Sequence, residues 1–218
     1  MTIPILYEDD DILAVSKPEA LAAIPERHGQ GGSLFEVLCE QRGERLYIVH
    51  RIDKETSGLI VFARHAEAHR RLNRQFETRA VEKTYLALAH GVIAADTGLI
   101  DAPLRPFGSG RVGVDPARGK PSTTEFGVVK RFGSHTLLEA RPRTGRRHQI
   151  RVHLYHLGHP IAGDPLYGDE AARRGFSRMM LHAWRLELTL PSGRRLAIEA
   201  PIAESFEAAL DTLRRTSG

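Results

Sequence analysis

Short apolar runs separated by polar turns recur along the whole chain, and their spacing predicts more strands than helices. Residues 59–63 (LIVFA) are apolar throughout, which is typical of a strand covered on both faces. Further strands are expected at residues 3–7, 12–16, 84–89, 123–130, 136–141, 183–190 and 196–199. Because many neighbouring strands look hairpin-linked, the predicted fold class is α+β, with a mixed, mainly antiparallel sheet and flanking helices.

Helical patterns appear in four segments. Ser33 and Glu36 form a capping-box pattern that opens a helix through about residue 41. Residues 147–157 carry an apolar stripe at helical spacing, followed by the stop signal Gly158-His159-Pro160. The stripe consists of Ile150, Leu154 and Leu157. The other two helices are expected at residues 66–76, with Leu72 and Phe76 on one side, and at residues 202–213.

The bulk composition is that of an ordinary globular protein, with 218 residues of which 41% are hydrophobic and 27% charged. No linker or repeat divides the chain, so a single domain over residues 1–218 is the simplest interpretation. No apolar run approaches the roughly twenty residues needed to cross a bilayer, and no signal peptide is evident. The lone Cys39 excludes an intrachain disulfide and is expected in the core. We therefore expect a cytoplasmic protein, monomeric by default.

The charge balance favours a polyanionic partner, but only weakly. The net charge is +4 and the pI is about 9.4, and many proteins with such values bind no nucleic acid. Basic residues cluster at 64–83, 105–120, 141–151 and 173–178. These clusters could neutralise several phosphates if the fold brings them to one face. A solvated, arginine-rich surface explains them equally well.

One familiar motif does not fit its context. Residues 108–113 (GSGRVG) match the G-x-G-x-x-G pattern of dinucleotide-binding loops. That loop should follow a strand and open a helix, whereas Pro103 and Pro106 precede this segment and Pro116 follows it. We interpret the segment as a flexible, basic loop.

A group of histidines invites a metal interpretation that the spacing does not support. His148, His153, His156 and His159 lie close together, but the H-E-x-x-H pattern is absent. Cys39 is the only possible thiolate ligand. We expect histidines that are partly buried or that face a polyanionic partner, no metal and no cofactor.

Two polar segments carry candidate chemistry. Residues 50–58 (HRIDKETSG) precede the buried strand, so they could present Asp53 from a sheet edge. A solvated turn, with Asp53 capping backbone amides, fits the same residues. Residues 141–151 (RPRTGRRHQIR) lead into a helix whose N-terminus, ringed by arginines, suits a phosphate. Spacing alone does not indicate whether the two segments meet.

These segments resemble the motifs of the RluA family of RNA pseudouridine synthases. HRIDKETSGLIVFA is similar to the family's HRLDxxTSG motif, with Ile52 where leucine is usual. DDILAVSKPEALAAIP, EKTYLALAHG, RTGRRHQIRVHLYHLGHPIAGDPLYG and MLHAWRLEL resemble four further family motifs in the same order. The resemblance covers most of the chain. It implies the pseudouridine-synthase fold, with two lobes and a central RNA-binding cleft, and without the N-terminal S4-like module of some relatives.

The resemblance also implies an activity, the isomerisation of uridine to pseudouridine in structured ribosomal or transfer RNA. Asp53 falls on the catalytic nucleophile, Tyr85 on the tyrosine that packs on the target uracil, and Arg151 on the arginine that ion-pairs with the aspartate. Arg51 falls on a residue implicated in filling the gap left by the flipped nucleotide. The expected RNA contacts are His50, Arg51, Thr144, Gly145, Arg146, Arg147, His148 and Gln149, with Arg143 and Lys120 as further phosphate contacts.

Two other functions compete with this interpretation. A non-catalytic RNA-binding or chaperone protein could keep the fold without the activity, but it would be expected to lack one of Asp53, Tyr85 and Arg151. A glycosidase-type hydrolase would pair two carboxylates about the scissile bond. Glu55 is the only acid close to Asp53 in the sequence, and nothing marks it as a general acid.

Overall fold

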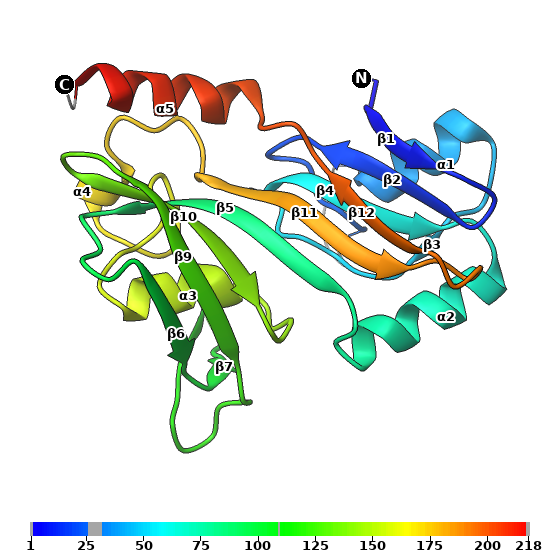
Figure 1. The fold of residues 1–218 in the computed structure, drawn as a ribbon, viewed down its shortest axis with the longest axis horizontal. Coiled ribbons are helices and arrows are strands. Elements are labelled where there is room, and N and C mark those ends of the chain that lie inside the picture. The colour runs from blue at the N-terminus through cyan, green and yellow to red at the C-terminus, as the bar shows by residue number, and fades with distance from the viewer. Residues whose placement is uncertain (1, 26–31, 109, 217–218) are drawn as a thin grey trace. The chain divides into compact units, whose positions relative to one another are not determined.

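The computed structural model describes residues 2–25, 32–108 and 110–216, and it divides into two compact units (Figure 1). Each unit is assembled from two separate stretches of the chain. The first comprises Met1–Lys83 and His182–Ala203, and the second comprises Thr84–Leu181 and Glu204–Gly218.

The first unit is built on a mixed sheet around one buried strand. Its strands are β1 (Ile5–Glu8), β2 (Ile12–Lys17), β3 (Tyr47–Ile48), β4 (Ser57–Ala63), β11 (Leu181–Thr189) and β12 (Arg195–Glu199). They follow the order β1-β2-β4-β11, with β12 paired to β11 and β3 paired to β4. Among the described residues of this unit, only the β4–β11 pairing is parallel. All residues of β4 are buried, as the apolar run predicts.

Two helices pack on opposite faces of this sheet. Side chains alternate between the two faces of a strand, so Val61 and Phe62 of β4 point in opposite directions. Helix α2 (Ala66–Glu77) places Leu72 in the cluster that contains Val61, while Phe35 of α1 (Leu34–Arg42) contacts Phe62. Helix α1 begins with the predicted capping box of Ser33 and Glu36.

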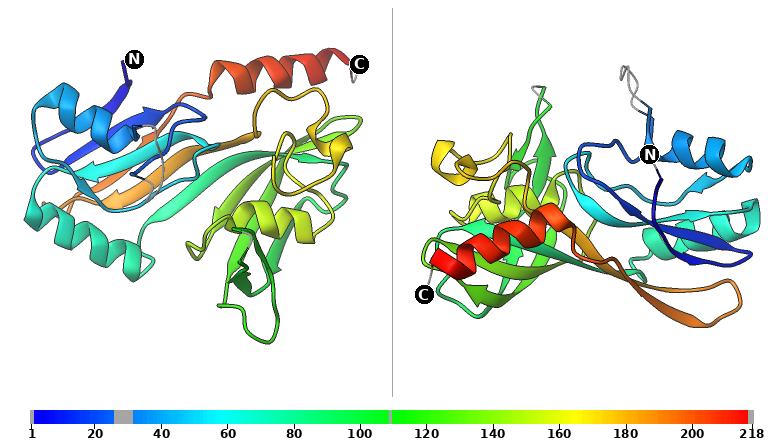
Figure 2. Two further views of the ribbon diagram at one scale, coloured as in Figure 1. Left: turned by 180° about the vertical axis from the view of Figure 1, so that it is seen from behind. Right: turned by 90° about the horizontal axis from the view of Figure 1, so that it is seen from above.

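The second unit contains an antiparallel sheet, a hairpin and three helices (Figure 2). The sheet order is β5-β10-β9-β6, formed by Glu82–His90, His135–Pro142, Thr123–Arg131 and Thr97–Asp101. Strands β7 (Leu104–Pro106) and β8 (Val112–Val114) form a separate hairpin. Helix α3 (Gln149–His156) contacts β8, β9 and β10.

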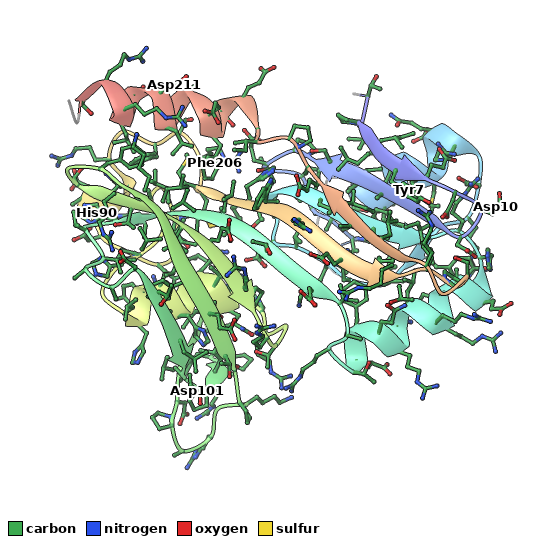
Figure 3. The ribbon with its side chains drawn as sticks, viewed as in Figure 1. Tyr7, Asp10, His90, Asp101, Phe206 and Asp211 are labelled. Atoms are coloured by element: carbon green, nitrogen blue, oxygen red, sulfur yellow. The ribbon has the colours of Figure 1, made fainter. Side chains whose placement is uncertain are left out.

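Two further helices complete the second unit. Helix α4 is short (Glu170–Arg173), and the C-terminal helix α5 spans Glu204–Thr216. Phe206 of α5 is fully buried, and the Arg178 guanidinium carbon lies 5.9 Å from the centre of its ring (Figure 3). No helix in the described part of the chain combines the length and apolarity needed to cross a bilayer.

The predicted fold class and every predicted helix and strand are confirmed, with ends that shift by a few residues. The short elements β3, β6, β7, β8 and α4 were not predicted. Three expectations need correction. Leu157 caps α3 and is 41% exposed, Cys39 is only half-buried, and the segment 108–113 contributes β8 to a hairpin. Ser109 lies outside the described residues.

The parallel contact between β4 and β11 depends on Gly58. A Cβ at this position would lie 2.3 Å from the carbonyl oxygen of Ala183, and its φ of +107° disfavours any L side chain. We expect Gly58→Ala to lower the free energy of unfolding by roughly 2–4 kcal/mol in urea titrations. Gly127→Ala is the matched control, because its Cβ would meet nothing within 4 Å. Equal stability of the two variants would show that β11 moves away from β4 at little cost.

Candidate active site

Asp53 lies in a tight turn that ends where β4 begins. The Thr56 N–H donates a hydrogen bond to the Asp53 carbonyl oxygen over 3.1 Å. Ile52 and Thr56, on either side, are 6% and 1% exposed, while Asp53 itself is half-buried and Arg51 is exposed. The turn therefore anchors its apolar and hydroxyl side chains in the first unit and leaves Asp53 partly accessible.

Lys17 holds this turn from the neighbouring strand. It is the last residue of β2, and only 1% of it is exposed. Its Nζ donates hydrogen bonds to the carbonyl oxygens of Pro18, Leu21 and Lys54, at 2.8, 2.7 and 2.9 Å. A buried ammonium is stable only when its protons are all engaged, and here the acceptors are fixed backbone groups. The residue after Asp53 is thereby tied to the sheet.

His50 closes a gap in the hydrogen bonding of β4. Strand β11 pairs with the start of β4, and strand β3 pairs with the end of β4. Val61 lies between these two paired regions, and its N–H donates a hydrogen bond to His50 Nε2 over 2.9 Å. The ring also stacks on Phe76, with centroids 4.7 Å apart. Burial, with a smaller effect of Lys83, lowers the pKa of His50 to about 3. A neutral ring is what the Val61 contact requires, because an imidazolium has no acceptor.

Ser57 and Gly58 join the start of β4 to β11. Ser57 Oγ and His182 Nδ1 share a hydrogen bond of 2.8 Å, and both residues are almost completely buried. Gly58 meets the backbone of Ala183, as described above. The turn with Asp53 is thus supported on three sides: by Lys17, by His50 and by β11.

Arg151 and Tyr85 belong to the second unit. Tyr85 is half-buried on β5, opposite Ala140 of β10. Arg151 is 1% exposed, and its Nε and Nη2 donate to the two carboxylate oxygens of Asp164, both over 2.8 Å. The Tyr167 ring centre lies 5.2 Å from the guanidinium carbon. Arg151 therefore sits in a rigid, charge-matched setting.

Asp164 does more than pair with Arg151. Its Oδ1 also accepts hydrogen bonds from the N–H groups of Leu166 and Tyr167, at 2.8 and 3.0 Å. The Tyr167 hydroxyl in turn contacts His148 Nδ1 and the Val112 N–H, at 2.9 and 2.8 Å. One buried network thus connects α3, the turn after it and the β7–β8 hairpin.

The arginine-rich loop before α3 is organised by an internal hydrogen-bond network. Gln149 Oε1 accepts from Thr144 Oγ1 and from the Arg146 N–H, at 2.6 and 3.0 Å. Gln149 Nε2 donates to the Thr123 carbonyl and to Thr124 Oγ1. His148 adopts a left-handed conformation with φ of 55° and makes no side-chain cap of the helix. The loop shape is therefore set by Thr144 and Gln149.

The predicted RNA contacts divide by exposure. Thr144, His148 and Gln149 are buried, and His50 and Arg146 are half-buried. Arg51, Gly145, Arg147, Arg143 and Lys120 are exposed. Arg143 is already in a two-pronged ion pair with Glu125, at 2.8 and 2.7 Å.

The grouped histidines serve structural roles where their contacts are defined. His153 is fully buried, with its ring nitrogens near Thr124 Oγ1 and the Ala102 carbonyl oxygen. His159 Nδ1 lies 3.0 Å from the His90 carbonyl oxygen. Within the described residues, no three metal-ligating side chains gather into a site.

Sequence reasoning did not single out Lys17, Asp164, Tyr167 or His182. All four stand within the motif segments already identified, so their presence there was a usable signal. Their hydrogen-bond and ion-pair partners could not be assigned from the sequence alone. Each partner is either a backbone group or a residue on another element.

The comparisons with known proteins concern the family and the fold of this chain. The sequence profile of the RNA pseudouridylate synthase family matches residues 11–156. The chain is 40% identical, over 97% of its length, to ribosomal large subunit pseudouridine synthase D of Nitrosomonas europaea and to ribosomal large subunit pseudouridine synthase C of Vibrio cholerae. It spans 65% and 69% of those two proteins.

Solved structures show the same fold. Human RNA pseudouridylate synthase domain containing 4 superposes with a TM-score of 0.80 and 27% identity, covering 97% of this chain and 93% of that one. The chain belongs to the RNA pseudouridylate synthase family. The predicted family is therefore confirmed.

The contrast between two arginine–carboxylate pairs generates a stability prediction. Arg151 and Asp164 have side chains 1% and 0% exposed, whereas Arg143 and Glu125 are 55% and 37% exposed. We expect Asp164→Asn to cost about 3–5 kcal/mol of unfolding free energy, because it leaves a buried guanidinium without its counter-charge. Glu125→Gln should cost less than about 1 kcal/mol. Denaturant titrations followed by circular dichroism would measure the unfolding free energies of both variants. Similar losses in the two variants would contradict the expectation that the buried ion pair contributes more to stability than the exposed one.

The neutral state of His50 predicts an acid-sensitive fold. Its pKa in the folded protein, about 3, is below the ordinary value of 6.5, so the unfolded chain takes up the proton first as the pH falls. The contribution of the neutral His50 ring to the free energy of unfolding is complete above pH 6.5 and is lost as the pH falls towards 3. Between pH 7 and pH 4.5 the wild type should lose roughly 1–3 kcal/mol more unfolding free energy than His50→Gln. Parallel pH profiles for the two proteins would refute this role of His50.

Proposed function

We propose that this protein isomerises uridine to pseudouridine in structured RNA, with Asp53 as the nucleophile. The observation that carries the proposal is the family membership together with Asp53 in the matching motif, on a turn held by Lys17 and by β4. The two curated relatives described above are named for ribosomal large subunit RNA. Large-subunit ribosomal RNA is therefore the first substrate to test, and transfer RNA the second.

The reaction itself places few demands on the protein. The N1–C1′ bond of the uridine breaks, the uracil turns, and a C5–C1′ bond forms. The proton on C5 is lost and N1 gains one, so atoms and electrons balance without an oxidant or reductant. Acid–base groups and a nucleophile are sufficient.

Asp53 suits the nucleophilic role because a carboxylate oxygen carries the lone pair that attack on an electrophilic carbon requires. Its attack requires a fixed direction, and fixing the turn is what the hydrogen bonds of Lys17 do. Three routes are open to Asp53: addition to C1′, addition to the uracil ring, or assistance of an elimination. Each route uses the same oriented carboxylate.

Tyr85 and Arg151 are assigned supporting roles. Tyr85 offers a flat face for the uracil and a hydroxyl for proton transfer at C5. Arg151 is assigned to pair with Asp53, as the family resemblance implies, and to fix the direction of its carboxylate. The bidentate contact with Asp164 supports this role, because it orients the guanidinium before substrate arrives.

Exposure sorts the expected RNA contacts into two groups. Arg51, Gly145, Arg147 and Lys120 are accessible, so we assign them to direct contact with the RNA. The target base must leave its stack to react, and Arg51 would fill the vacated space. Thr144 and Gln149 face inward, and we assign them to shaping the loop that presents Arg147. The cellular setting that such a substrate implies is the cytoplasm.

The activity is testable by tritium release from RNA labelled at uracil C5. Wild-type protein should release tritium from large-subunit ribosomal RNA taken from a strain lacking the gene, and Asp53→Asn should release none above background. Glu55→Gln, a neighbouring carboxylate in the same turn, is the control and should retain activity. Binding without release by the wild type, on both ribosomal and transfer RNA from that strain, would favour the non-catalytic RNA-binding alternative.

A further inference from the structure

A cavity of about 580 Å³ lies in the second unit, between the β7–β8 hairpin and α3. Its floor is apolar and buried, formed by Val112 of β8, Val152 of α3 and Tyr167. Asp53, Tyr85 and Arg151 do not line it. Its volume is within the range of small-ligand sites, which is about 300–1,000 Å³. The cavity is therefore separate from the residues assigned to catalysis.

The walls of the cavity are two aromatic side chains that remain unusually accessible. Phe107 is 44% exposed and Tyr155 is 52% exposed, and both line the opening. The Phe107 ring lies against Gly113, where a Cβ would come within 2.9 Å of Cε2. The glycine thus makes room for the ring to stand at the mouth of the cavity. Exposed aromatic faces in such a recess are typical of a stacking site.

The rim of the cavity carries the guanidinium of Arg111, beside the imidazole of His156. The Arg111 guanidinium lies over the Tyr167 ring, 5.8 Å from its centre, and donates to the Leu166 carbonyl. Arg147 approaches the hairpin, with Nη2 3.9 Å from the position of a Cβ at Gly110. None of the described residues that line the cavity is acidic. A ligand with both a planar ring and negative charge would match this lining.

We propose that this cavity binds an unpaired base of the RNA substrate, other than the target uridine. The base stacks on Tyr155 or Phe107, and its flanking phosphates lie beside Arg111 and Arg147. The proposal rests on the function proposed above, because RNA is the ligand already implied. Arg111 and Val112 belong to the segment 108–113, which does not fit a dinucleotide loop, and they supply part of the rim and part of the floor.

The position of Tyr155 connects this site with Arg151. The two residues are four positions apart on α3, and Asp164, the partner of Arg151, lies in the same turn as Tyr167. An RNA base seated against Tyr155 would therefore be held by the same rigid helix that carries Arg151. The site would contribute to substrate selection, because only an RNA with an unpaired nucleotide at the right spacing can fill it.

Photocrosslinking tests the location directly. Fragments of large-subunit ribosomal RNA are bound to the wild-type chain and irradiated with short-wavelength ultraviolet light, which crosslinks unmodified bases of every kind. The complexes are then digested, and the nucleotide-bearing peptides are identified by mass spectrometry. We expect adducts on the peptides that contain Phe107 or Tyr155, in addition to any near Asp53. Absence of adducts on both peptides, while adducts form elsewhere, would overturn the proposal.

Affinity measurements test the stacking. Tyr155→Ala should bind the same RNA fragments roughly 5- to 100-fold more weakly, while Tyr155→Phe, which keeps the ring, should bind like the wild type. The slope of log affinity against log salt should be unchanged in Tyr155→Ala, because no phosphate contact is lost. Arg147→Gln should instead reduce that slope. Val129→Ala, 53% exposed on β9, is the control for loss of an exposed apolar side chain.

The outcomes separate this proposal from the proposed function. Tritium release by the wild type together with unchanged RNA affinity in Tyr155→Ala and Phe107→Ala would overturn the stacking site alone. Crosslinks at Tyr155 with no tritium release by the wild type would overturn the activity alone. A wild-type dimer in sedimentation that Tyr155→Ala converts to monomer would show that a second copy of the chain occupies the cavity, and that would also overturn the proposal.

Discussion

The burial of β4 is the constraint on which the turn that carries Asp53 depends. A strand covered on every side cannot leave its polar groups to water, so each must find a partner within the protein. The Val61 N–H finds His50, Ser57 finds His182, and the adjoining turn is bound by Lys17. Lys17 ties the turn that carries Asp53 to the same sheet. The hydrogen bonds that stabilise this sheet therefore also hold the turn in place.

Buried polar groups also find partners within the protein around α3 of the second unit. Six consecutive residues of this short helix are buried, including Arg151, whose charge is matched by Asp164. Gln149 shapes the preceding loop, and Tyr155 reaches the cavity beyond. A helix buried this completely has little freedom to shift, so the separations between Gln149, Arg151 and Tyr155 are well defined.

Local signals in the sequence were sufficient for the regular elements. The apolar run of β4, the capping box of Ser33 and the stripe of α2 all specify their structure through neighbours in the chain. The family motifs were recognisable for the same reason, and the resemblance that they carry makes Asp53, Tyr85 and Arg151 candidate site residues. The partners of Arg151, Lys17 and Ser57 were not predictable, because they depend on which distant segments meet. Leu157 was misassigned because helical spacing does not show where a helix leaves the core.

The interleaving of the two units has a consequence for how the protein is made. The sheet of the first unit needs β11 and β12, which are translated about a hundred residues after its other strands. During synthesis on the ribosome, part of one edge of β4 therefore has no partner strand until the second unit has been translated. An unpaired edge of an apolar strand is a target for chaperones and for misassociation. Strands that are synthesised after the whole sheet of the second unit thus complete the support of the turn that carries Asp53.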